Sequence, residues 1–479
     1  MFGYALGSIG LPMVGSLLAA LLPGEQARKV SQVFSFLGFL CGLMLLVTFA
    51  ANPGTYTWEL ATVGDLTYYG IIVDSLSVLV NFLVVTIGWL VCTYSLGYMT
   101  PENREHPIEE GLPRFFALLL LFIGAMAGLV FSSTLFGLLF FFEITGLCSW
   151  GLIGFYGTPK SRRSALRAIV LTHIAALGLY VATAYLYANT GSLDVTALSD
   201  LTETGKVVAF LGILIACWGK SAQLPFQSWL PGAMVAPTPV SAYLHAASMV
   251  KVGVYILART VQATQGIPPV IGLVGAILAT ATMVYGFLMY FPQDDMKRLL
   301  AYSTIAQLAY IFLAVSIAVF GSEKAFAGAV THIFNHSFGK ALFFLVAGAL
   351  SYTTGTRQLS RLQGILRQMP LVGLGFLAAA LTITGVPLFS GFFSKFLILL
   401  GGLEAGRTNL VLLALTIVFL LESVGSFIWL LKVTGASVLG APSEAVAAAA
   451  PLPRSMGFAL GCLMAMTLVS QYIAFSLIR

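Results

Sequence analysis

Charged side chains are scarce in this sequence. Only 9% of its 479 residues are Asp, Glu, Lys or Arg, whereas 58% are hydrophobic. A soluble domain carries about 25% charged residues. Acidic residues are scarcer than basic ones, 18 against 24 Lys and Arg. The composition excludes an ordinary soluble protein and predicts an integral membrane protein.

Paired cysteines are also lacking. Five cysteines lie singly in apolar segments, with no C-x-x-C pair among them: Cys41, Cys92, Cys148, Cys217 and Cys462. This spacing argues against zinc sites, iron–sulfur clusters and a disulfide framework. We therefore expect no cofactor and no redox centre in this chain.

What the chain has instead is long apolar segments. Fourteen have about the length that a membrane-spanning helix needs. They predict an all-α polytopic membrane protein of fourteen transmembrane helices. The segments lie near residues 4–22, 30–50, 71–97, 115–131, 133–156, 165–188, 206–226, 238–259, 268–290, 297–318, 326–350, 371–400, 409–431 and 455–477.

Basic residues sort between alternate loops. Fifteen, Lys297 among them, fall on one side, here called the basic side; five, including Arg259 and Arg479, fall on the other. We expect a multi-pass protein of a prokaryotic cell (inner) membrane. The asymmetry is the positive-inside bias of such proteins, and it predicts both termini on the outer side. It also accounts for the net charge of +6 without a nucleic-acid partner.

Four lysines remain, and all lie within predicted spans together with several acids and histidines. Ionisable groups inside a membrane are costly, so each is a candidate functional residue. The lysines are Lys220, Lys251, Lys340 and Lys395, the acids are Glu143 and Glu422, and the histidines are His173, His245, His332 and His336.

The stretch THIFNHSFGKALFFL shows the pattern best. His332, His336 and Lys340 are spaced four residues apart, which places them on one face of a helix. The spacing of the two histidines also suits a metal, but no acid is near and Lys340 would repel a cation, so we predict no metal site. Histidine and buried lysine can both titrate near neutral pH, which favours a proton path whose charge state a moving carboxylate such as Glu143 could control.

A structural role is the alternative explanation for three residues. His173 stands alone and could simply pack in the core, Asp74 could cap a helix at the interface, and Glu422 could pair with an interfacial base. Each is retained as a possible additional member of the path.

Two predicted spans contain interior prolines. Pro225 follows Lys220 by five residues, and Pro387 precedes Lys395 by eight. Proline interrupts a helix, and paired interruptions point to inverted repeats, although simple kinks are the alternative. The predicted organisation is residues 1–114, first repeat 115–259, second repeat 268–431 and a last helix within 432–479.

Several long motifs occur in a recognisable order. They are FFFEITGLCSWGLIGFY, WGKSAQLPFQSWLPGAMVAPTPVSAYLHAASMVKVGVYILAR, DDMKRLLAYSTIAQLAY, THIFNHSFGKALFFL and GVPLFSGFFSKFLIL. They resemble the antiporter-like proton-translocating subunits of respiratory complex I, membrane-bound hydrogenases and Mrp cation/proton antiporters. The resemblance covers essentially the whole chain. It implies fourteen core helices, two inverted five-helix repeats, and breaks in helices seven and twelve.

The resemblance also implies roles for the residues. Glu143 would pair with Lys220, and His245 and Lys251 would continue the path. The central axis would be His332, His336 and Lys340, with Lys395 as the exit residue. The implied partners are other antiporter-like subunits, small membrane subunits and peripheral redox subunits.

Four functions compete. The first is a proton-translocating subunit of a redox-driven complex, with partners supplying the redox chemistry. Others are a subunit of an Mrp-type sodium/proton antiporter, the membrane partner of an inorganic-carbon uptake complex, and a purely structural anchor. Sodium prefers oxygen ligands, and four buried lysines against few carboxylates favour protons. An anchor would not need lysines aligned with histidines.

Overall fold

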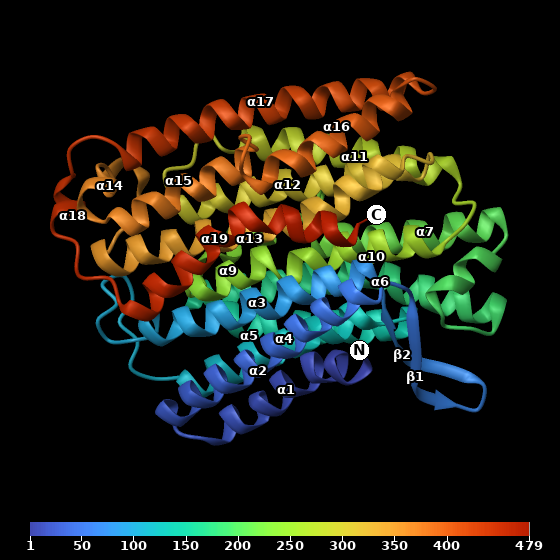
Figure 1. Ribbon diagram of the computed structural model, residues 1–479, viewed down its shortest axis with the longest axis horizontal. Coiled ribbons are helices and arrows are strands. Elements are labelled where there is room, and N and C mark those ends of the chain that lie inside the picture. The colour runs from blue at the N-terminus through green and yellow to red at the C-terminus, as the bar shows by residue number, and fades with distance from the viewer. Residues whose placement is uncertain (479) are drawn as a thin grey trace.

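Long helices running side by side make up most of the molecule (Figure 1). The computed structural model describes residues 1–478, so Arg479 lies outside the described residues. Within them, twelve helices are long and apolar enough to cross a membrane. The prediction of an all-α polytopic membrane protein is confirmed, apart from one β-hairpin.

The hairpin follows the first two helices and was not predicted. It is antiparallel and turns at Gly64, whose φ is +61°. The apolar segment that starts near residue 71 first completes strand β2, and its helix begins only at Ser75. Asp74 caps that helix by accepting a hydrogen bond from the Ser77 backbone N–H, and the Ser77 hydroxyl oxygen accepts one from the Asp74 N–H. The elements are α1 (Phe2–Leu21), α2 (Gly24–Ala51), β1 (Tyr56–Val63), β2 (Leu66–Val73) and α3 (Ser75–Tyr98).

The middle of the chain contains the first broken helix. Threonines at positions 134, 158 and 202 cap α5, α6 and α7 through their side chains, which fixes where those helices begin. The elements are α4 (Leu112–Phe131), α5 (Leu135–Ile153), α6 (Pro159–Thr190), η1 (Val195–Asp200), α7 (Glu203–Lys220), α8 (Trp229–Gly232), η2 (Ala233–Val235), α9 (Thr238–Ala246) and α10 (Met249–Ala263).

The last part of the chain contains the second broken helix. Ser322 caps α13, and Gly355 ends it in the left-handed conformation that glycine adopts without strain. The elements are α11 (Pro269–Leu288), α12 (Met296–Ala318), α13 (Glu323–Thr354), η3 (Leu359–Arg361), α14 (Ile365–Gln368), α15 (Pro370–Thr384), α16 (Ser390–Gly406), α17 (Leu410–Val438), α18 (Glu444–Ala447) and α19 (Arg454–Leu477).

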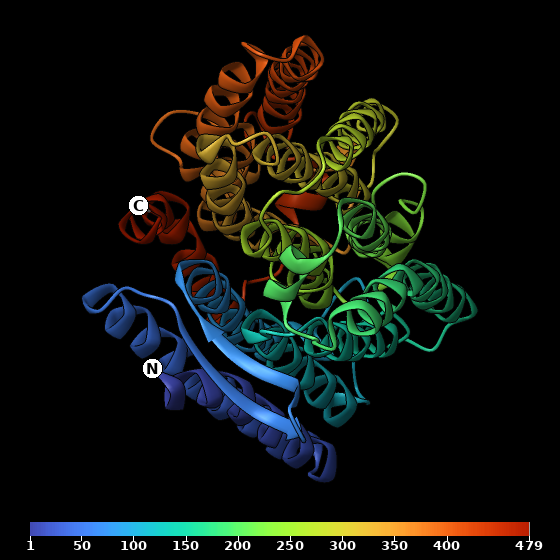
Figure 2. The same cartoon turned by 90° about the vertical axis from the view of Figure 1, so that its right-hand side faces the viewer.

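A few helices form the centre of the bundle, seen end-on in Figure 2. In α12, α13 and the α9–α10 pair, every residue of the apolar stretch is buried. In α2 and α17, only 28% of the residues in that stretch are buried. Helix α13 packs against α3, α9, α12, α15, α16 and α19. Polar groups on α13 are therefore shielded from lipid by surrounding helices.

Two of the fourteen predicted segments are interrupted at a proline. In the segment near 206–226, α7 stops at Lys220 and Pro225 lies in the non-helical stretch before α8. In the segment near 371–400, α15 stops at Thr384, Pro387 follows, and α16 starts at Ser390. These two interrupted segments account for the difference between the fourteen predicted spans and the twelve long apolar helices. A third interruption, at residues 247–248 between α9 and α10, has no proline and was not predicted.

Close backbone contact holds α7 in place. A side chain at Gly212 on α7 would put its Cβ 2.4 Å from the carbonyl oxygen of Gly178 on α6, and one at Gly178 would lie 2.3 Å from the Gly212 oxygen. Only glycine at both positions lets the two helices approach this closely. The contact fixes the half-helix that ends at Lys220.

Candidate functional site

Seven of the eight basic residues predicted inside the membrane are buried, and His173 is the exception. Each of the four lysines is at most 7% exposed, and the three central histidines are at most 1% exposed. They lie on α7, α9, α10, α13 and α16, which are neighbours in the bundle. We call this set the basic row: Lys220, His245, Lys251, His332, His336, Lys340 and Lys395.

Direct contacts join the centre of the row. The Nζ of Lys251 lies 2.7 Å from Nδ1 of His336. The His336 and His332 rings are 5.6 Å apart between centroids. His332 is held by the Ser394 hydroxyl at 2.8 Å and by the Gln307 side-chain oxygen at 3.1 Å. Side chains from α10, α12, α13 and α16 thus converge on two neighbouring imidazoles.

Hydroxyl groups on α12 hold two other members. Lys340 donates from Nζ to the Ser303 hydroxyl at 2.7 Å, and His245 Nδ1 lies 3.0 Å from the Thr304 hydroxyl. Sequence reasoning did not single out Ser303, Thr304 or Gln307. The available signal was three polar residues at positions 303, 304 and 307 of an otherwise apolar span.

Two imidazole nitrogens in the row have no hydrogen bond within residues 1–478. They are Nε2 of His245 and Nε2 of His336, and both are buried. Their Nδ1 atoms are engaged, so each ring is held in position. The free Nε2 can accept a proton where Nδ1 carries the ring hydrogen and can donate one where Nδ1 accepts, and both roles suit a relay.

The row ends at the second broken helix. Lys395 donates to the carbonyl of Thr384, the last residue of α15, at 3.1 Å, and to the Ser423 hydroxyl at 3.2 Å. Its Nζ lies 5.2 Å from the centre of the Tyr310 ring. The interrupted helix therefore supplies a backbone acceptor to the lysine. A cavity of about 290 Å³ borders Lys395 and Ser423.

Glu422 is buried next to this end. It accepts hydrogen bonds from the Tyr310 hydroxyl and, at 2.6 Å, from the Ser426 hydroxyl. It is 4% exposed and makes no ion pair in the described part of the chain. The alternative in which Glu422 pairs with an interfacial base does not match this geometry.

The predicted pairing of Glu143 with Lys220 is not a direct ion pair here. Across residues 1–478, the only ion-pair partner of Glu143 is His173, whose Nδ1 lies 3.2 Å from the carboxylate. Lys220 instead donates to the Phe142 carbonyl at 2.8 Å and lies 4.0 Å from the centre of the Phe142 ring. Lys220 therefore bonds to the α5 backbone and not to the carboxylate.

Glu143 and His173 face outward from the bundle. Their side chains are 30% and 54% exposed, and both border a surface cavity of about 570 Å³ with Ile144, Leu147 and Val170. His173 is therefore not a core packing histidine. The Glu143 oxygen that contacts His173 is Oε2, whereas Oε1 is buried and has no hydrogen-bond partner within residues 1–478.

Asp74 serves as the helix cap that the sequence suggested, and it also binds Arg259. The guanidinium donates to the two carboxylate oxygens at 2.5 and 2.9 Å. Burial disfavours the charge on Asp74, but Arg259 and the Ser77 N–H keep the pKa of Asp74 below its ordinary value. Arg259 was counted as a loop cation, yet it is only 2% exposed because α10 extends beyond the predicted span end.

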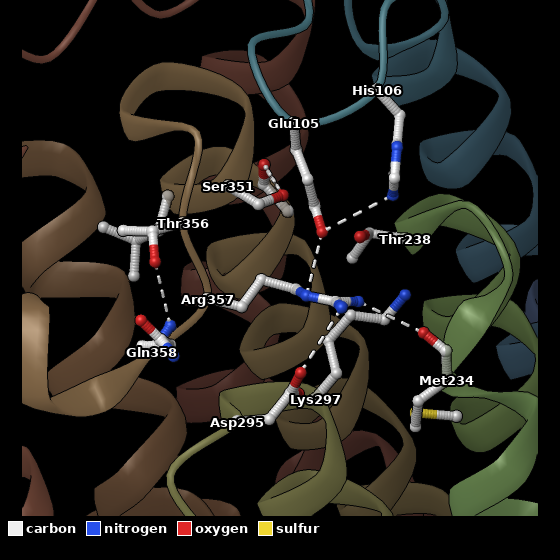
Figure 3. A network of polar contacts seen from close by, with 12 residues as sticks. Glu105, His106, Met234, Thr238, Asp295, Lys297, Ser351, Thr356, Arg357 and Gln358 are labelled. Carbon is white, nitrogen blue, oxygen red and sulfur yellow. Dashed lines mark hydrogen bonds and ion pairs between the residues drawn. The ribbon is translucent and has the colours of Figure 1, made fainter.

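Lys297 was also counted as a loop cation and is buried. It is 1% exposed, and its Nζ donates to the Ala236 carbonyl at 2.7 Å. Figure 3 shows it beside Arg357, which binds Glu105 at 2.8 Å and Asp295 at 3.3 Å. The network ties the α3–α4 loop, the start of α12 and the loop after α13 together on the basic side.

The sequence matches two family models. Residues 132–420 match the family described as NADH:quinone oxidoreductase/Mrp antiporter, TM, and residues 61–116 match that described as NADH-Ubiquinone oxidoreductase (complex I), chain 5 N-terminus. NADH-quinone oxidoreductase subunit L of Escherichia coli is 36% identical over 434 residues, covering 86% of this chain and 68% of that protein. In Rhizobium meliloti, one subunit of a probable K(+)/H(+) antiporter is 35% identical over 412 residues, covering 83% of this chain and 40% of that protein.

Solved structures are similar as well. The Mrp complex from Dietzia contains a chain with a TM-score of 0.84 and 28% identity, covering 96% of this chain and 49% of that one. A chain of an archaeal membrane-bound sulfane sulfur reductase has a TM-score of 0.85 at 22% identity, covering 99% and 97%; it shows the shared fold. The chain belongs to the NADH:quinone oxidoreductase/Mrp antiporter family of membrane proteins.

Proposed function

We propose that this chain carries protons through the membrane as an antiporter-like subunit of a multi-subunit redox-driven complex. The observation that supports this most is the basic row: seven buried lysines and histidines lie on adjacent helices, and Lys251, His336 and His332 at its centre are in direct contact. A structural anchor would not retain so many costly groups in its interior.

The proposed path starts at Glu143 and His173 and passes Lys220 on the first broken helix. It continues through Lys251 and His336 to His332, with Lys340 and His245 beside it, and ends at Lys395. We further propose fourteen spans arranged as two inverted repeats near 115–259 and 268–431, with both termini on the outer side. The two interruptions, each next to a lysine of the row, support this organisation.

The redox chemistry would belong to partner subunits. The relatives include subunits of NADH-quinone oxidoreductases, and this chain has no paired cysteines for a cluster. The Glu143–His173 pair is partly exposed on the outside of the bundle, which favours contact with a neighbouring membrane subunit. A carboxylate facing lipid alone would be costly.

The test uses Lys340→Ala in the assembled complex, reconstituted into liposomes. Redox turnover is measured together with proton uptake by an internal pH dye. We expect assembly and redox turnover to persist while proton uptake is lost, because the row loses the titratable group that bonds to Ser303 on α12. Lys432→Ala, which removes an exposed lysine on the basic side, is the matched control and should pump normally. Normal proton uptake by an assembled Lys340→Ala complex would refute the proposal.

A second candidate is a subunit of a cation/proton antiporter. The similarity to the Mrp structure and to the probable K(+)/H(+) antiporter of Rhizobium meliloti favours it. Against it, the interior of the row offers cations rather than the oxygen ligands that sodium or potassium needs. Proton movement driven by a sodium or potassium gradient, without any electron donor, would identify this function.

A further inference from the structure

A hollow lies on the basic side of the bundle, next to the first broken helix. Helix α7 stops at Lys220, so on the basic side of that point only the short α8 and η2 continue the segment. The hollow has a volume of about 380 Å³ and is also bounded by the start of α6, the end of α11 and the start of α12. It is separate from the basic row.

Cations dominate the lining of this hollow. Lys160, Arg167, Arg298 and Arg357 line it, with Asp295 as the one carboxylate among the lining residues. Asp295 is already bound to Arg357 at 3.3 Å. The other three cations make no ion pair with any residue between 1 and 478. Three positive charges thus surround one concave site without compensation from the chain.

The other lining groups suit the membrane surface. Ser164 and Ser228 add hydroxyls, and Tyr285 and Tyr302 form an edge-on ring pair with centroids 6.4 Å apart. Tyrosine is typical of the boundary between headgroups and acyl chains. These polar groups lie at the basic-side ends of α6, α11 and α12, where we expect the lipid headgroups.

Exposed apolar surface continues from the hollow toward the membrane interior. On α6, Val170 and Ile174 follow Arg167 by one and two turns and are 44% and 52% exposed. They also border the Glu143–His173 cavity, so an acyl chain here would lie between the hollow and the neighbouring subunit proposed above. On α11, Ile277 lies two turns inward from Tyr285 and is 49% exposed. A ligand with an anionic head and apolar tails fits this combination, whereas a free anion or an acidic peptide would leave the apolar surface unused.

We propose that this hollow binds the phosphate headgroup of an anionic phospholipid, with its acyl chains against α6 and α11. Guanidinium groups pair strongly with phosphate oxygens, and basic pockets between membrane helices are suited to anionic lipid heads. The bound lipid would fill the space left by the broken helix and brace α8 and η2.

The experiment compares two triple variants of the full chain in its native complex, extracted in mild detergent. Lys160→Gln/Arg167→Gln/Arg298→Gln removes the unpaired cations of the hollow. Arg162→Gln/Arg163→Gln/Arg361→Gln removes three cations from the same side that do not line it. Retained lipids are counted by native mass spectrometry. After delipidation, melting temperature is followed with added phosphatidylglycerol, phosphatidylethanolamine or inorganic phosphate.

We expect the wild type and the control to retain anionic phospholipid and to melt at higher temperature with phosphatidylglycerol only. The hollow variant should lose both the retained lipid and the upward shift. Equal retention and equal shifts in both triple variants would overturn the proposal. A full upward shift with inorganic phosphate would also overturn it, because the hollow would then bind a free anion. So would cross-linking of Arg298→Cys to a side chain of another protein, because an acidic protein partner would then occupy the hollow.

Discussion

Removing Asp74 should destabilise the chain strongly, because it leaves Arg259 buried without its counter-charge. The two side chains are only 10% and 3% exposed, and they share contacts of 2.5 and 2.9 Å. Two unit charges about 4 Å apart at an effective dielectric constant of about 20 attract by about 4 kcal/mol. This agrees with the roughly 3–5 kcal/mol typically lost when one partner of a buried pair is removed.

Asp74→Ala also removes a helix cap, so the two effects must be separated. Ser77→Ala removes the hydrogen bond from the Asp74 N–H to the Ser77 hydroxyl. It keeps the backbone N–H bond to Asp74 and the ion pair, and it should cost at most about 1 kcal/mol. The double variant Asp74→Ala/Arg259→Met removes the stranded charge and should recover most of the loss.

The assay is unfolding of the purified chain in mixed micelles, followed by circular dichroism as denaturing detergent is added. The pKa of Asp74 is lowered in the folded chain, so its contribution is present above the ordinary Asp value near pH 4 and is lost as the pH falls below it. The reasoning fails if Asp74→Ala costs no more than Ser77→Ala at pH 7, or if the double variant is as unstable as the single one.

Three further predictions follow from other contacts. Gly212→Val should destabilise the chain by about 1–3 kcal/mol in the same unfolding assay, because its Cβ would meet the Gly178 carbonyl oxygen; a neutral result would contradict that close approach. Tyr310→Phe removes a hydrogen bond to Glu422 and should slow turnover-coupled proton uptake roughly tenfold, since the loss of about 1.4 kcal/mol corresponds to that factor. An unchanged rate would mean that Glu422 is not part of the proton path. Burial, together with nearby cations, lowers the pKa of His106 despite the adjacent carboxylate. The contribution of His106 to stability should therefore be complete above about pH 6.5 and should fall as the pH decreases. His106→Gln should flatten this pH dependence in thermal melts at about pH 5–7.

Much of the architecture was predictable because membrane spans have a strong sequence signal. Apolar length indicated the helices, and Pro225 and Pro387 indicated two of the three interruptions. The third, at residues 247–248, has no proline, so nothing in the local sequence marks it. The hairpin was missed because strand β2 and helix α3 are both apolar and join into one continuous run, which hydropathy alone cannot divide.

The site was predictable where it depends on one helix and not where it depends on several. The four-residue spacing places His332 and His336 on one face of α13, as periodicity requires. The contact between Lys251 and His336 joins residues 85 apart, which no local pattern reveals. Lys297 was misassigned because the sequence places it at a span end, whereas the loops of Figure 3 cover it.

The arrangement of the row has a consequence for how the membrane voltage acts. Its members lie on helices that stand side by side, so the steps from α7 to α10, α13 and α16 run mainly across the helix axes. A charge crossing the whole membrane does work of about 2.3 kcal/mol per 100 mV, but a charge moving parallel to the membrane plane does almost none. Transfers from helix to helix should therefore be nearly insensitive to voltage. The electrical work of transport should fall on the step from His336 to His332, which runs along α13, and on the steps that connect the row to the two aqueous sides.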